Sequence, residues 1–207
     1  MSIFDPLAER LSFLKLLHPR ELKRLSDLQL HTLVEREALR SRTRVSALEA
    51  AYPSATPREL AQRLVDHKKG LAGMLGGVSG VFGLFGLPAD LLAVAYLQLT
   101  LLVDVATLYK ANLKTERART ELLDLFGYAS GAGPLTRSGP KVVGTLGGLV
   151  LARGGLKTLG RALPLVAAPV SAWLNNQALQ GVGEQAVRHY EGFSKAQAKS
   201  RSRRSAP

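Results

Sequence analysis

The sequence contains no cysteine. Without thiols the chain can form no disulfide bond, no thiolate zinc site and no cysteine-based catalytic centre. Aromatic residues are also scarce, at 6% with a single tryptophan, so leucine and small residues must fill most of the interior. The opening stretch MSIFDPLAER has no basic segment followed by an apolar run. We therefore expect no secretory signal and a cytoplasmic location.

Runs of alternating apolar and polar residues, which are typical of half-buried strands, are missing as well. Helix signals occur instead along most of the 207 residues, which are enough for one sizeable core. With 46% hydrophobic and 21% charged residues, the composition is that of a globular protein. We predict an all-α fold, a compact multi-helix domain with a central glycine-rich apolar helix pair.

Acidic residues are few, at 16 against 28 Lys and Arg, which gives a net charge of +12. Two stretches hold much of the excess, because neither the segment between Asp124 and Glu184 nor the segment 195–207 contains an acid. Segment 195–207 has no large apolar side chain, and we expect it to be disordered. We predict that the cations of both stretches contact membranes or other anions: Arg137, Lys141, Arg153, Lys157, Arg161, Lys195, Lys199, Arg201, Arg203 and Arg204.

Local signals place several helix boundaries. Tyr52-Pro53 breaks a long charged helix, and Thr56-Pro57-Arg58-Glu59 has the pattern of a capping box that starts the next one. We expect that next helix to end at His67-Lys68-Lys69-Gly70, where cations would lie at the negative end of the helix dipole.

Glycines recur at intervals of mostly three residues between 70 and 86. On a helix they would form a smooth stripe, and we expect Gly76, Gly77, Gly80 and Gly83 to face a closely packed neighbour. Leu87-Pro88-Ala89-Asp90 then restarts a helix whose remainder, 91–109, is apolar almost all round. The predicted central antiparallel pair therefore spans 71–109.

The segment GLFGLPADLLAVAYLQLTLLVDVATLY, 83–109, resembles the first signature block of the EcsC family. The segment 161–190 is similar to the second block of that family, although the chain has Lys110 and Ala167 where the family tends to have glycine. The resemblance implies a helical fold near a membrane, without an assigned activity. It marks as motif residues of unknown role Pro88, Asp90, Asp104, Tyr109, Pro164, Asn175 and Asn176.

These features divide the chain into three predicted parts. Residues 1–69 form an N-terminal charged helical segment, residues 70–194 an EcsC-like apolar helical core, and residues 195–207 a basic tail.

Motifs that would indicate catalysis or a bound cofactor are missing. No two of the four histidines have metal-ligand spacing, and the glycines match neither a phosphate loop nor a nucleophile elbow. We therefore assign no catalytic, cofactor or metal residue, and lean against an enzyme.

Two acids interrupt the apolar stretch. Asp90 fits the stabilisation of a helix N-terminus. Asp104 lies between two valines, so we expect it to be buried with a Lys, Arg or amide partner. For the amides of Asn175 and Asn176 the favoured role is to cap or bridge neighbouring helices, and pairing with Asp104 is the alternative.

The sequence leaves several functions open. The favoured interpretation is a non-enzymatic, membrane-associated protein that binds an anionic lipid surface, at the inner face of the membrane, or a hydrophobic partner. The alternatives are an integral hairpin with 71–109 inserted, and a soluble enzyme or binding protein for a hydrophobic ligand. Nucleic-acid binding through the tail is a further alternative, weakened by the lack of interleaved aromatics.

Overall fold

The computed structural model describes residues 27–81, 87–129 and 176–194, with the side chains of 74–81 and 87–92 left out of the description. These residues contain five helices and no strand, which confirms the predicted all-α class. Four are α3 (Asp27–Ala51), α4 (Pro57–Val81), α5 (Leu87–Leu108) and α6 (Glu116–Ala129). The fifth spans 176–194.

Helix α4 begins where the sequence predicts it. The Thr56 amide donates to Glu59 Oε2 at 2.7 Å, and the Glu59 amide donates to Thr56 Oγ1 at 3.3 Å, so the capping box is formed. The predicted end of this helix at 67–70 is wrong, because α4 continues to Val81. Lys68 is 1% exposed and pairs with a carboxylate of α5, so its charge serves an interior contact rather than a helix end.

Helix α5 begins at Leu87, as the Leu-Pro-Ala-Asp turn predicts, and closes with a Schellman motif. The Ala111 amide donates to the Ala106 carbonyl and the Lys110 amide donates to the Thr107 carbonyl, both at 2.9 Å. Lys110 takes the left-handed position with a φ of 60°. Thr115 then caps α6, since its Oγ1 accepts from the Ala118 amide at 3.3 Å.

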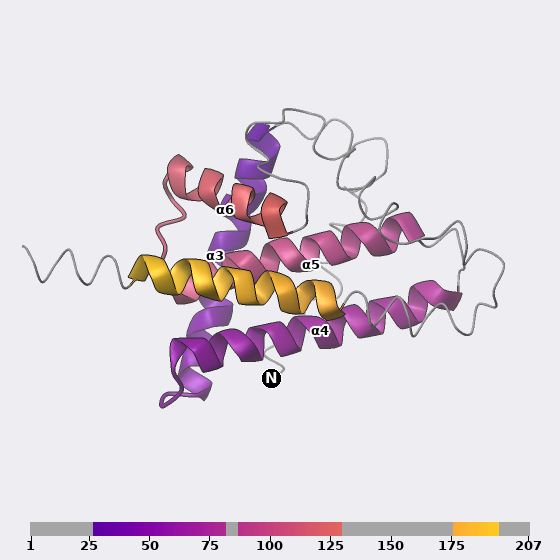
Figure 1. Ribbon diagram of the computed structural model, residues 1–207, viewed down its shortest axis with the longest axis horizontal. Helices are drawn as coiled ribbons and strands as arrows, with labels where there is room; N and C mark the ends of the chain where they lie inside the picture. Colours follow the sequence, from indigo (N-terminus) through magenta and orange to yellow (C-terminus); the bar gives the residue numbers. More distant parts are fainter. Residues whose placement is uncertain (1–26, 82–86, 130–175, 195–207) are drawn as a thin grey trace, which may run out of the picture.

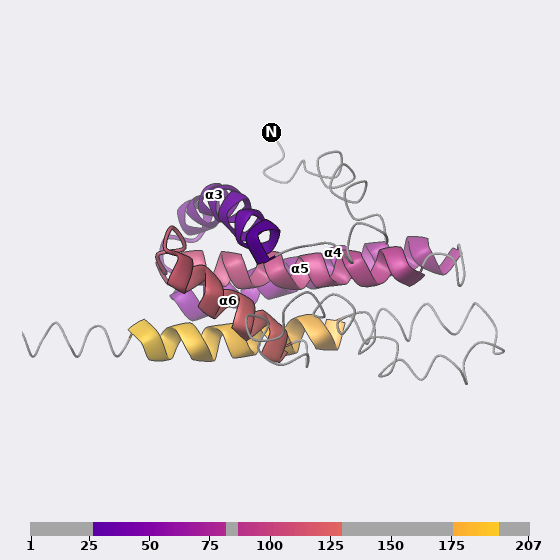
Figure 2. The ribbon, with the colours of Figure 1, turned by 90° about the horizontal axis from the view of Figure 1, so that it is seen from above.

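The helices form three layers (Figures 1 and 2). Helices α4 and α5 run antiparallel in the middle, which confirms the central pair. Helix α3 crosses this pair on one side, and helix 176–194 runs along it on the other. Helix α6 packs against α3 and α5. The core is centred on α5, where residues 101–106 are all 0% exposed.

One glycine permits a close approach of helices. A Cβ on Gly183 would lie 2.3 Å from Val65 Cγ2 of α4 and 3.6 Å from Leu101 Cδ2 of α5. By contrast, a Cβ on Gly70 or Gly73 would meet nothing within 4 Å. The predicted packing of Gly76, Gly77, Gly80 and Gly83 falls outside the described residues.

Candidate functional site

Asp104 is the centre of a network of charged side chains in the middle of the core. Its side chain is fully buried on α5, and its Oδ1 accepts from Arg44 of α3 through Nε at 3.1 Å and Nη2 at 2.6 Å. Lys68 Nζ of α4 lies 3.3 Å from the other oxygen, Oδ2, in an ion pair. The prediction that Asp104 is buried with a basic partner is therefore confirmed, with two partners in place of one.

The network continues along α3 to a second buried acid. Arg44 Nη2 also lies 2.6 Å from Glu37 Oε1, and Tyr96 of α5 donates its hydroxyl to Glu37 Oε2 at 3.1 Å. Arg40 approaches the same Oε2 at 3.6 Å from the surface. We call Glu37, Arg44, Lys68, Tyr96 and Asp104 the ionic cluster.

The ionic cluster balances charge, with two carboxylates against one guanidinium and one ammonium. Burial by itself raises the pKa of Asp104, but the charges of Lys68 and Arg44 and hydrogen bonds from Arg44 and Ser41 outweigh it, so the pKa lies below its usual value. Burial, reinforced by Glu37, raises the pKa of Tyr96 to about 12. The lowered pKa of Asp104 and the raised pKa of Arg44 keep this pair ionised near neutral pH.

The cluster is closed to solvent at its centre. The side chains of Asp104, Lys68 and Glu37 are 0%, 2% and 3% exposed, and the hydrogen bonds and ion pairs already occupy the carboxylate oxygens. A substrate could reach neither acid without separating α3 from the α4–α5 pair. What the cluster can do is fix the position of three helices, because its members face one another only in one packing.

Asn176 does not join this cluster, so its proposed pairing with Asp104 is wrong. The Asp104 contacts come from α3 and α4, whereas Asn176 belongs to the helix on the other side of the α4–α5 pair, and its Oδ1 has no hydrogen-bond partner among the described residues. The other candidate amide, Asn175, lies outside the described residues.

Tyr109 joins the end of α5 to helix 176–194. Its hydroxyl donates to Glu191 Oε1 at 3.2 Å, and Arg58 of α4 lies 3.9 Å from Glu191 Oε2. Burial and the Glu191 charge raise the pKa of Tyr109 to about 12. Two further polar contacts attach the same helix, Lys69 Nζ to Gln180 Oε1 at 3.2 Å and His189 Nε2 to Glu121 Oε1 at 3.0 Å.

The side chains of the remaining sequence candidates lie outside the described residues. Pro88 and Asp90 lie in the first turn of α5, but their side chains are outside the described residues. The same is true of Pro164 and of all ten cations assigned to anion contact.

Sequence reasoning missed Glu37, Arg44 and Lys68. The available signal was weak: Glu37 and Arg44 are seven residues apart and so share a face of α3, but α3 carries many other charged residues. Only the buried acid on α5 shows which of them turn inward.

No group of three or more histidine, aspartate or glutamate side chains in the described residues is arranged to hold a metal ion. Within the same residues, no helix is both long enough and apolar enough to cross a membrane.

Comparison with known families gives one result. The model of the EcsC protein family matches residues 18–138, a range that includes every member of the ionic cluster. The match covers the first of the two motif blocks recognised in the sequence and ends before the second, at 161–190. No curated protein and no solved structure gives a match.

Proposed function

We propose that this chain, which belongs to the EcsC protein family, is a non-enzymatic protein that binds reversibly to anionic membrane surfaces. Two basic segments, 130–175 and 195–207, would make the contact, and the described helices would carry them. The proposed surface is the inner face of the membrane, where anionic lipids attract Lys and Arg.

The observation that carries this proposal is the separation of charge. Residues 27–81, 87–129 and 176–194 together contain 13 Lys and Arg and 13 Asp and Glu, whereas the whole chain has 28 and 16. The helices of the structure are thus neutral, and the net charge of +12 belongs to the other segments. Segments 130–175 and 195–207 contribute five cations each and no acid.

The two basic segments adjoin opposite ends of one helix. Segment 130–175 leads into helix 176–194, and segment 195–207 follows it. At 1.5 Å per residue the 19 described residues of this helix are about 28 Å long. Two linked contacts with one surface raise the overall affinity through a high effective concentration, even when each alone is weak.

The apolar character of α5 fits a packing role. Its residues 101–106 are enclosed by the other helices, and its charged Asp104 is paired within the protein. We therefore favour surface contact over insertion of 71–109 as a hairpin.

Co-sedimentation with anionic and neutral vesicles over a salt series tests the proposal. Each cation near an anionic surface contributes about 1 kcal/mol, so deletion of 195–207 should reduce binding to anionic vesicles by at least about tenfold at low salt. The reduction should be smaller at high salt. Charges are screened beyond about 8 Å at physiological ionic strength, and the screening distance becomes shorter as salt is added.

A matched control removes five charges from the described part of the chain, outside the two basic segments. Glutamine at Arg36, Arg63, Lys114, Arg117 and Arg188, all exposed, lowers the net charge by as much as the deletion does. This variant should bind anionic vesicles within about twofold of the parent. Equal binding of the parent to neutral and anionic vesicles, or an equal loss in both variants, contradicts the proposal.

A further inference from the structure

A cavity of about 350 Å³ lies between α3 and the segment that joins α5 to α6. The residues around it include two cations, Arg42 and Lys110, and two uncharged polar side chains, Thr107 and Asn112. The wall is completed by small or apolar side chains, Ala38, Ala111 and Leu113, and no acidic residue of the described chain lines it. Its volume is at the small end of the range for ligand pockets, which begins at about 300 Å³.

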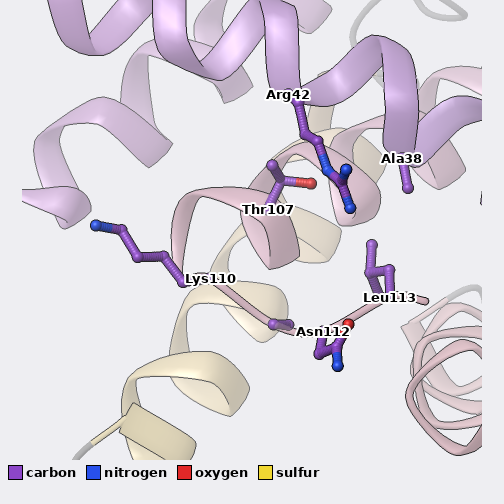
Figure 3. A pocket seen from close by; sticks show the side chains of 7 residues that line it. Ala38, Arg42, Thr107, Lys110, Asn112 and Leu113 are labelled. Atoms are coloured by element: carbon purple, nitrogen blue, oxygen red, sulfur yellow. The ribbon is translucent and has the colours of Figure 1, made fainter. Parts of the chain in front are cut away.

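Arg42 differs from its neighbours Arg40 and Arg44 in having no acidic partner in the described part of the chain. Arg40 and Arg44 both contact Glu37, whereas no ion pair within the described residues involves Arg42 or Lys110. Figure 3 shows the Arg42 guanidinium reaching down from α3 toward Thr107 and Leu113, whereas Lys110 borders the cavity with its backbone and its side chain extends away from Arg42. A guanidinium in this position can donate two parallel hydrogen bonds to an oxyanion.

The backbone of Lys110 gives a second, independent observation. Its φ of 60° places a lysine at the position of the Schellman motif that glycine normally occupies. A left-handed residue with a side chain costs about 1 kcal/mol relative to glycine. The chain thus tolerates a local strain that glycine would remove, at a lysine whose backbone borders the cavity and whose flexible side chain can turn toward a bound anion.

The electrostatic balance favours an anion. The carboxyl end of α5 also borders the cavity, and a helix end contributes about half a negative charge. The full positive charge of Arg42 outweighs this contribution, and Lys110 adds a second charge when its side chain turns toward the anion.

We propose that this cavity binds a phosphate group, with Arg42 as the bidentate donor and Lys110 as the second charge. The phosphate can belong to a lipid headgroup or to a small soluble anion. Only the lipid form rests on the proposed membrane function.

The test uses the full-length protein with inorganic phosphate as probe, titrated at constant ionic strength and followed by calorimetry. Arg42→Gln should weaken phosphate binding by about tenfold or more, because it removes a charge-assisted pair of hydrogen bonds. Arg36→Gln, at an exposed arginine of α3 away from the cavity, should stay within about twofold of the parent.

Lys110→Gly separates binding from folding. The variant should raise the melting temperature by about 2–4 °C by relieving the strain, and should also weaken phosphate binding. A purely structural role for Lys110 would not combine higher stability with weaker binding. Absence of phosphate binding to the parent, or equal binding by the parent and the Arg42 variant, overturns the proposal.

Vesicles identify the source of the phosphate. Phosphatidic acid exposes a phosphate monoester, so vesicles containing it should bind the parent better than phosphatidylglycerol vesicles of equal surface charge, and Arg42→Gln should abolish the difference. No preference in the parent, together with binding of inorganic phosphate, assigns the cavity to a soluble anion. A third outcome separates the two proposals. If both kinds of vesicle bind the protein in a salt-dependent way, but neither Arg42→Gln nor added inorganic phosphate changes that binding, the cavity proposal is overturned and the proposed function stands.

Discussion

Helices α3 and 176–194 pack on opposite sides of the α4–α5 pair, and they are held there by different means (Figure 2). The junction with α3 contains the ionic cluster, in which Arg44 and Lys68 meet Asp104 in the interior. The junction with helix 176–194 has its polar contacts at the periphery and a close fit inside, since Gly183 lies against Val65 and Leu101 where no Cβ would fit. Charge pairing demands particular partners, whereas close packing demands only small volume, so the two junctions should respond differently to mutation.

Loss of the central acid should have the largest effect. Asp104→Asn leaves Arg44 and Lys68 buried with one carboxylate between them, and we expect it to lower the free energy of unfolding by about 3–5 kcal/mol. Adding Lys68→Met restores the charge balance, and the double variant should lose less than the sum of the single losses by at least about 1 kcal/mol. Urea unfolding of the four proteins measures this. Additive losses would mean that the two charges do not stabilise each other.

Acid should weaken the same junction. The pKa of Asp104 is lower in the folded chain than its value of about 3.9 in an unfolded one. The stabilisation from its charge is therefore full above that unfolded value and is lost as the pH falls through the lowered folded pKa. The difference in stability between the parent and Asp104→Asn should accordingly be constant from pH 7 to about pH 5 and shrink below about pH 4. A difference that grows in acid contradicts the assignment.

A substitution at Gly183, in the junction with helix 176–194, should lower the free energy of unfolding by less than Asp104→Asn does. Gly183→Ala places a methyl group against Val65, and we expect the free energy of unfolding to fall by about 1–3 kcal/mol through overpacking. Gly181→Ala is the matched control, because it lies on the same helix with nothing within 4 Å of its Cβ. It should be stabilising by up to about 1 kcal/mol through helix propensity. Thermal melts of the two variants should thus move in opposite directions.

Tyr109→Phe should have the smallest effect. It removes the hydroxyl that Glu191 accepts at 3.2 Å but keeps the ring, and an ordinary hydrogen bond contributes about 1 kcal/mol. Hydrogen exchange at amides 185–194 should become faster if this bond holds the end of helix 176–194. Unchanged exchange there would assign the attachment to packing alone.

Local sequence signals predicted much of the fold. The capping box at Thr56 and Glu59 and the proline-led start at Leu87 are formed by residues within one turn, so they work without knowledge of the rest of the chain. The same locality explains the error at Lys68. A cation before a glycine has the pattern of a helix end, and only its contact with Asp104, 36 positions away, shows that the helix continues.

The candidate sites were less predictable, for the same physical reason. The need of Asp104 for a partner follows from its apolar neighbours, but the identity of the partner depends on how α3 crosses α5, 60 residues away. No sequence pattern distinguishes Gly183 from Gly181, because only the rotation of their helix determines which of the two faces α4. The cavity at Arg42 likewise forms from residues of two elements that no local pattern brings together.

The contacts of helix 176–194 also determine how the protein would withstand a pull. A load applied to the end of this helix along its axis would act parallel to α4 and α5, because the helix runs beside them. Polar contacts at Gln180 near one end, and at His189 and Glu191 near the other, would share that load in shear instead of failing one after another. If the protein binds a surface through 195–207, helix 176–194 could therefore stay packed on α4 and α5 while the molecule is pulled along that surface.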